Sequence, residues 1–130
     1  MSCVEIETVS EILKKLGFSR LKEPVIIIGL NPYTFVELNR GSFYVCSNSA
    51  SLKKLISEKA KEFGKSDVLC VSTIYIVNNV TDEWIARYRI ELMYQEEIDD
   101  TDIIAILRSE HKSFFRKKCI PLSDIFKEIK

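Results

Sequence analysis

Four cysteines offer the widest range of chemistry in this sequence, and their spacing limits it. Cys3, Cys46, Cys70 and Cys119 are dispersed, no two of them form a Cys-x-x-Cys pair, and His111 is the only histidine. A structural zinc site needs four Cys or His ligands, which usually come as two close pairs. The sequence therefore predicts no metal and no cofactor, and we interpret the cysteines as small buried apolar side chains.

A disulfide is the alternative use of these cysteines. Cys46 and Cys70 form the pair to test, because both lie in segments that are predicted to be core strands. Cytosolic disulfides are rare except in hyperthermophiles. The composition is rich in Ile, Lys and Glu and poor in Gln, which is compatible with a thermophilic source.

An acidic cluster and a strand face of mixed charge suggest metal-dependent chemistry but do not supply a motif for it. Carboxylates at residues 96–102 could bind Mg²⁺ or Ca²⁺, yet the segment lacks the glycine and ligand order of an EF-hand loop, so a solvated turn and helix cap is favoured. Arg87, Arg89 and Glu91 share a strand face that could belong to a metal-dependent nuclease. No Glu-x-Lys pair follows at Glu91, so we favour a solvated or dimer-facing ladder. The acidic cluster comprises Glu96, Glu97, Asp99, Asp100 and Asp102.

A basic stretch near the C-terminus is the candidate nucleic-acid contact. Its cations are interleaved with two phenylalanines, and such a pattern can bind RNA or DNA through phosphate contacts and stacking. The same residues fit a helix with an aromatic edge toward the core and a favourable charge at its C-terminal end. His111 has no Ser or Cys nucleophile motif beside it, so we assign no catalytic residue. The cations are Lys112, Arg116, Lys117 and Lys118.

Composition bounds the class of protein. Lys and Arg number 19, as do Asp and Glu, so the formal net charge is zero, which disfavours nucleic-acid binding and leaves little repulsion against self-association. The 130 residues are 46% hydrophobic, which predicts one globular domain over residues 1–130. The N-terminus is acidic where a secretory signal is basic, and no apolar run could span a bilayer, so we expect a cytoplasmic protein without a membrane partner.

The segment at residues 68–77 is apolar at almost every position and is the most informative structural pattern. Such a run predicts one strand of a sheet that is covered on both faces. We expect Ile27, Val71 and Ile74 in the core. Other strands are predicted at residues 25–28, 42–47 and 85–95, with a long connection over residues 29–41. Helices are predicted at residues 8–16 and 52–63, the latter ended by Gly64, and at residues 124–129, capped by Ser123 after Pro121.

The segment at residues 103–107 is ambiguous. It is either a last strand or the start of a helix that runs to Lys118, and the acidic start and basic end favour the helix. The resulting class is α+β, a single domain with a mostly antiparallel sheet of four or five strands and helices packed on it. This order of elements resembles that of the roadblock and longin group of small α/β sandwiches. That resemblance implies a dimerisation or scaffold module, often linked to small GTPases.

The sequence therefore favours a non-enzymatic interaction or scaffold module that forms a homodimer or binds a protein partner. Strand 85–95 is the candidate interface, because alternating strands near a sheet edge offer unpaired backbone groups. Its outward-facing residues are Arg87, Arg89, Glu91 and Met93. The alternative is a small nucleic-acid-binding or metal-dependent nuclease-like protein that uses the basic stretch.

Overall fold

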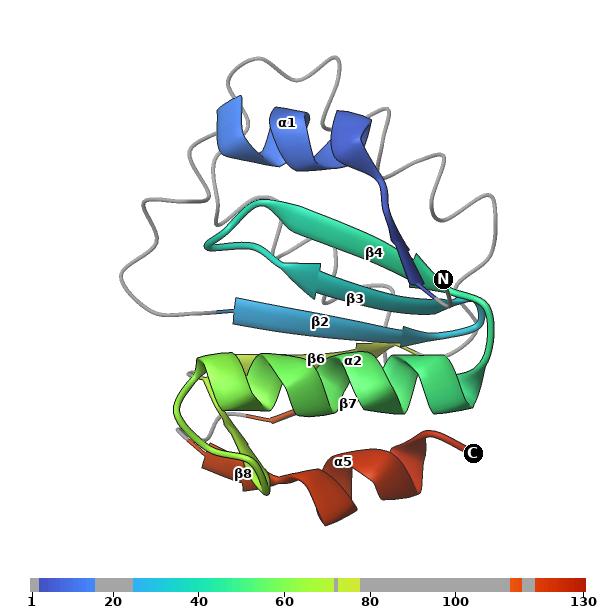
Figure 1. Ribbon diagram of the computed structural model, residues 1–130, viewed down its shortest axis with the longest axis vertical. Coiled ribbons are helices and arrows are strands. Elements are labelled where there is room, and N and C mark those ends of the chain that lie inside the picture. Colours follow the sequence, from blue (N-terminus) through green and yellow to red (C-terminus); the bar gives the residue numbers. More distant parts are fainter. Residues whose placement is uncertain (1–2, 16–24, 72, 78–112, 116–118) are drawn as a thin grey trace.

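A six-stranded sheet with helices packed on it forms the centre of the fold (Figure 1). The computed structural model describes residues 3–15, 25–71, 73–77, 113–115 and 119–130. The strands lie in the order β1-β4-β3-β2-β6-β7; β2 and β6 are parallel, and every other neighbouring pair is antiparallel. A second sheet pairs β5 with β8. The predicted α+β class and mostly antiparallel sheet are confirmed, and the described residues contribute six strands to that sheet rather than four or five.

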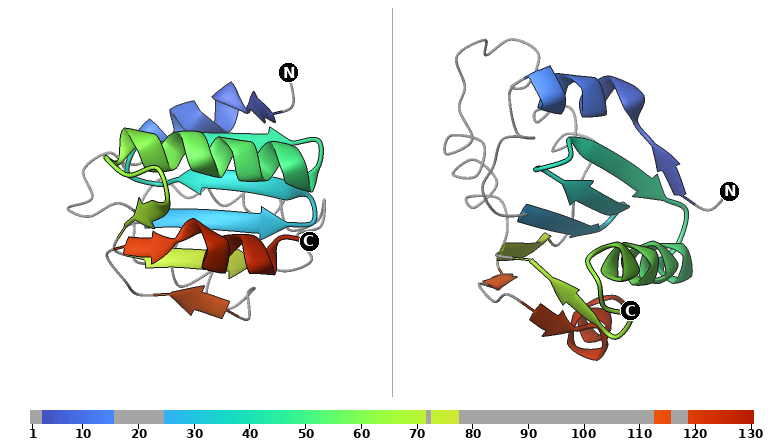
Figure 2. Two further views of the ribbon diagram at one scale, coloured as in Figure 1. Left: turned by 60° about the horizontal axis from the view of Figure 1, so that its bottom comes forward. Right: turned by 60° about the vertical axis from the view of Figure 1, so that its left-hand side comes forward.

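The elements follow one another with short connections over most of the described chain. In order they are β1 (Cys3–Glu5), α1 (Glu7–Lys15), β2 (Val25–Leu30), β3 (Tyr33–Glu37), β4 (Ser42–Cys46), α2 (Ser49–Glu62), β5 (Val68–Cys70), β6 (Thr73–Val77), β7 (Ser113–Phe115), β8 (Cys119–Pro121) and α5 (Leu122–Glu128). Figure 2 shows α2 and α5 lying across the same face of the sheet. No helix among the described residues is long and apolar enough to cross a membrane.

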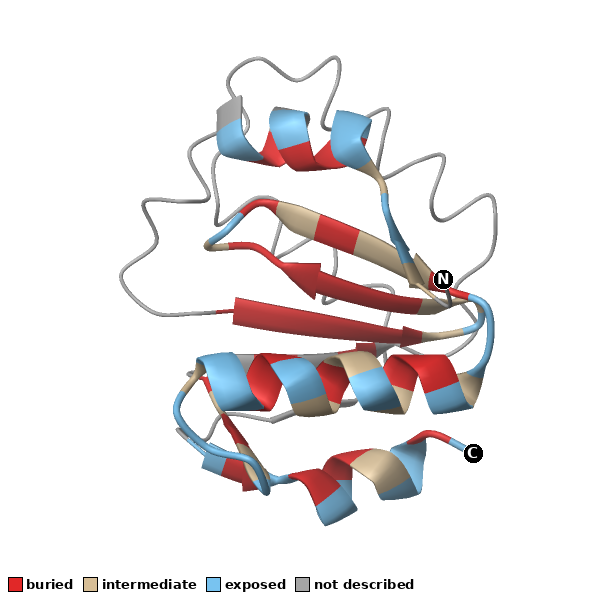
Figure 3. Cartoon of the chain, viewed as in Figure 1, coloured by how far each residue is buried: buried red, intermediate tan, exposed pale blue. Residues whose placement is uncertain are grey.

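Both faces of the sheet are buried at its central strands (Figure 3). Side chains alternate along a strand, so Ile26 and Ile28 point toward α2 and join a core that also includes Ile56 and Ile74. Ile27 points to the other face and is also buried. The predicted two-sided covering and the burial of Ile27, Val71 and Ile74 are therefore confirmed.

The apolar run at residues 68–77 forms two strands in two sheets, so the prediction of one central strand was wrong. β5 carries the buried Leu69 and pairs with β8, whereas β6 carries Ile74 and Ile76 and pairs with β2. Val71, between the strands, is buried as well. Because Val71 is buried next to the point where the chain leaves β5, the apolar pattern gives no sign of the break.

The segment from residue 29 to 41 also differs from the prediction, because it contains β3. β2 continues through Leu30, a tight turn at Asn31 and Pro32 follows, and β3 then pairs with both β2 and β4. The sequence did not predict β3, because two of the buried side chains of this strand, Thr34 and Glu37, are polar. Polar residues inside a strand disrupt the apolar pattern by which a buried strand is recognised.

The helices on either side of the sheet have clear local signals. Asn48 caps α2, its side-chain oxygen accepting a hydrogen bond of 2.8 Å from the Ser51 backbone N–H, and Gly64 follows the helix with a φ of +91°. α1 packs against β4, where the Phe43 backbone N–H donates to the Ser10 hydroxyl. The predicted helices at residues 8–16 and 52–63 are confirmed, with α2 beginning three residues earlier than expected.

The C-terminal part corrects two predictions. Residues 113–115 form strand β7, paired with β6, so a helix running from residue 103 to 118 was wrong over that stretch. The terminal helix is confirmed, but its N-cap is Pro121 rather than Ser123, and Pro121 is also the last residue of β8. Residues 103–107 lie outside the described part of the chain.

Candidate functional site

The residues singled out from the sequence as interface, nucleic-acid or metal candidates all lie outside the described ranges. This applies to the strand face of Arg87, Arg89, Glu91 and Met93, and to the acidic cluster at residues 96–102. It applies equally to His111 and the basic stretch. In the part of the chain that the structure does describe, the polar side chains gather elsewhere. They meet between the β3–β4 hairpin and the second half of α2.

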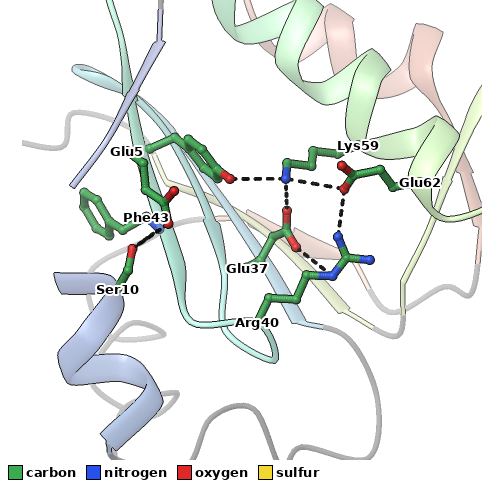
Figure 4. Close-up of polar contacts among 8 residues, drawn as sticks. Glu5, Ser10, Glu37, Arg40, Phe43, Lys59 and Glu62 are labelled. Atoms are coloured by element: carbon green, nitrogen blue, oxygen red, sulfur yellow. Dashed lines mark hydrogen bonds and ion pairs between the residues drawn. The ribbon is translucent and has the colours of Figure 1, made fainter. Parts of the chain in front are cut away.

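A buried carboxylate forms the centre of this charge cluster (Figure 4). The Glu37 side chain is 0% exposed, and its two oxygens lie 3.0 Å from Lys59 Nζ and 3.3 Å from Arg40 Nε. Glu62 completes the cluster, with one oxygen 2.7 Å from an Arg40 nitrogen and 3.4 Å from Lys59 Nζ. Neither Glu37 oxygen has a described partner at hydrogen-bond angles, so charge, rather than directed hydrogen bonding, holds it.

Lys59 is the residue that links the sheet to α2. Its ammonium donates a hydrogen bond of 3.3 Å to the Tyr44 hydroxyl and lies 4.9 Å from the centre of the Tyr44 ring. Burial disfavours its charge, but the interactions of the ammonium with Glu37 and then with Tyr44 outweigh that effect, so the pKa of Lys59 is raised. Likewise, slight burial opposes the charge of Glu62, but Arg40 and Lys59 lower its pKa.

The protonation of this cluster limits its chemistry. A lysine acts as a nucleophile or general base only when it is neutral, and the raised pKa keeps Lys59 charged. Its ammonium lies within ion-pair distance of Glu37 and Glu62 and donates a hydrogen bond to the Tyr44 hydroxyl. The cluster therefore acts as a charged clamp that holds α2 on the hairpin, and it has the chemistry of a structural element.

A surface groove of about 450 Å³ runs along α2 beside this clamp. Its floor is formed by Cys3 of β1 and Tyr44 of β4, and α2 forms its wall. Two exposed side chains of that wall, Lys54 and Glu58, carry opposite charge and make no ion pair with another described residue. The α2 residues lining the groove are Ser51, Lys54, Leu55, Glu58, Lys59 and Glu62.

All four cysteines form disulfides, which corrects two predictions. Cys3 is bonded to Cys46 and Cys70 to Cys119, so the cysteines are not free, and the pair Cys46 and Cys70 is not the bonded one. Each bond joins directly opposite residues of neighbouring antiparallel strands, β1 with β4 and β5 with β8. The sequence did not predict β1 or β8 as strands, so it gave no reason to pair Cys46 with Cys3 or Cys70 with Cys119.

The described residues contain no group of three His, Cys, Asp or Glu side chains that could hold a metal ion. Comparison with known proteins found no family model, no curated protein and no solved structure that matches this chain. The charge clamp, the groove and the β1 edge of the sheet are the features of the described residues that bear on function.

Proposed function

We propose that this protein is a non-enzymatic interaction module that works as a homodimer. The observation that carries the proposal is the state of strand β1 (Cys3–Glu5). Among the described strands it pairs only with β4 and forms an edge of the six-stranded sheet. A free strand edge presents unpaired N–H and C=O groups, and proteins either protect such an edge or pair it with another chain.

Three features of β1 and the net charge of the chain favour pairing over protection. The Cys3–Cys46 disulfide ties β1 covalently to β4, so the edge is held in place before any partner arrives. Val4 is 57% exposed, and among the described residues it is the only large hydrophobic side chain that is exposed. β1 contains neither proline nor lysine, two residue types that often protect an edge, and the one charged side chain in its three residues is Glu5. The zero net charge of the chain leaves little general repulsion against a second copy.

The chemistry of the charge clamp supports a non-enzymatic role. Lys59 is charged and contacts Glu37, Glu62 and Tyr44, and all four cysteines are bonded in disulfides. These groups therefore serve stability, while the sheet edge and the groove remain as surface for binding. This assignment agrees with the scaffold role that the order of elements suggested.

The disulfides also bear on where the protein works. They fit either an oxidising compartment or the cytoplasm of a hyperthermophile. We favour the second, because the composition is rich in Ile, Lys and Glu, as is common in thermophilic proteins.

Light scattering after size exclusion tests the homodimer. A dimer has about twice the chain mass of 15.0 kDa, and Val4→Asp should shift it toward the monomer by placing like charges at the paired edge. Val4 is exposed, so this change should leave the fold intact. A monomer at high micromolar concentration would overturn the proposal.

A further inference from the structure

We infer that the groove along α2 is part of the homodimer interface, with Lys54 of each copy placed against Glu58 of the other. This inference rests on the proposed homodimer and names the surface and the contacts that build it. The occupant of the groove is the α2 wall of a second copy of this chain.

The groove lies on the side of α2 that faces the β1 edge of the sheet. Its floor residues, Cys3 and Tyr44, belong to β1 and β4, which are the last two strands on that side. A second copy that pairs with the edge of β1 extends the sheet, and its own α2 then lies on the same face. The two grooves consequently face each other across the two-fold axis.

The groove wall is self-complementary in charge. Ser51, Lys54, Glu58 and Glu62 follow one another at intervals of three or four residues, which places them along one side of α2. A two-fold axis makes the two copies of α2 antiparallel, so Lys54 and Glu58 exchange places across it. Each lysine then meets a glutamate of the other copy, and the contact occurs twice per dimer. Both side chains are exposed and have no other described ion-pair partner.

A single two-fold axis can relate both the two β1 strands and the two α2 helices of the dimer. The Cys3 sulfur lies 3.5 Å from the Ser51 carbonyl oxygen, whereas Glu5 stands opposite Tyr44, whose hydroxyl contacts Lys59. Val4, the centre of β1, therefore lies beside the stretch of α2 between residues 51 and 59. The midpoint between Lys54 and Glu58, at Ile56, falls within the same stretch. An antiparallel pairing centred on Val4 thus brings Lys54 and Glu58 into register.

Charge reversal tests this interface, with the dissociation constant of the dimer measured by sedimentation equilibrium. Lys54→Glu or Glu58→Lys alone replaces two attractive contacts with two repulsive ones, and each should raise the dissociation constant at least about tenfold. The double variant restores opposite charges and should return to within about threefold of the wild type. The matched control is Lys65→Glu, which makes the same charge change at an exposed residue beyond α2 and should have no effect.

Each outcome separates this inference from the proposed homodimer. If the wild type dimerises and both single variants have the same dissociation constant as the wild type, the proposed interface is wrong but the homodimer stands. A dimer that dissociates on Arg89→Glu instead would assign the interface to the segment at residues 85–95. A double variant as weak as the single variants would show that the two residues do not face each other. A wild-type monomer would overturn both proposals.

Discussion

Lys59 is the central cation of the charge clamp, and Lys59→Ala should destabilise the fold strongly. The substitution leaves Glu37, whose side chain is 0% exposed, without its closest cation at 3.0 Å. Removing one partner of a buried ion pair usually costs about 3–5 kcal/mol, because the remaining charge is uncompensated. Arg40 remains 3.3 Å from the other Glu37 oxygen but is itself 41% exposed, so its compensation is partial. We expect a loss of about 3 kcal/mol in the free energy of unfolding.

Urea denaturation at neutral pH, monitored by circular dichroism, measures this loss. Lys61→Ala is the matched control, since it removes an exposed lysine two residues away and should change stability by less than about 0.5 kcal/mol. The variant with both Glu37→Leu and Lys59→Met should recover most of the stability, because an apolar pair of similar volume carries no charge to desolvate. A loss below about 1 kcal/mol for Lys59→Ala would refute the reasoning, as would a double variant no more stable than Lys59→Ala.

Three further predictions concern pH, a turn and a disulfide. Because the pKa of Lys59 is raised above its ordinary 10.5, its contribution to the free energy of unfolding is complete below pH 10.5 and is lost as the pH rises further. Urea denaturation from about pH 9 to 12 should show this decline in stability, and Lys59→Met should make the pH dependence flatter. Gly41→Ala should lower the free energy of unfolding by about 1–3 kcal/mol, since φ is +66° and a methyl group would lie 3.2 Å from the Ser10 carbonyl oxygen. Gly64→Ala is the control, because Gly64 also has a positive φ but has open space around it, and it should lose less stability. Equal losses of stability in the two variants would contradict the contact at Gly41. Replacing Cys3 and Cys46 together by Ala should cost about 2–5 kcal/mol in the same assay, because the bond joins residues that are 43 positions apart; an unchanged midpoint would contradict a closed bond in the wild type.

The features that sequence predicted well are those with a strong local cause. α2 combines an Asn cap, an amphipathic period and a terminal glycine, so each local signal agrees with the final structure. The buried strand β2 is β-branched at four successive positions, a pattern few other structures produce. The two-sided covering of the sheet followed from the same kind of evidence.

The features that escaped prediction depend on contacts distant in sequence. The buried Glu37 is compensated by Arg40 nearby in the sequence and by Lys59 from α2, and nothing near Glu37 in the sequence indicates the second of these partners. The disulfides are set by the register of β1 on β4 and of β5 on β8, and three-residue strands carry too little pattern to be recognised. The groove likewise exists only once α2 lies beside the edge of the sheet.

A mixing experiment tests the central claim, the α2 and β1 homodimer, most directly. The Lys54→Glu and Glu58→Lys proteins should each be monomers of 15.0 kDa at a concentration at which the wild type is dimeric. In a heterodimer of the two variants, one copy carries a glutamate at both positions and the other carries a lysine at both, so both contacts across the axis become attractive. An equal mixture should therefore give a species of about twice the chain mass by light scattering. A mixture that stays monomeric, or single variants that remain dimeric, would contradict the account.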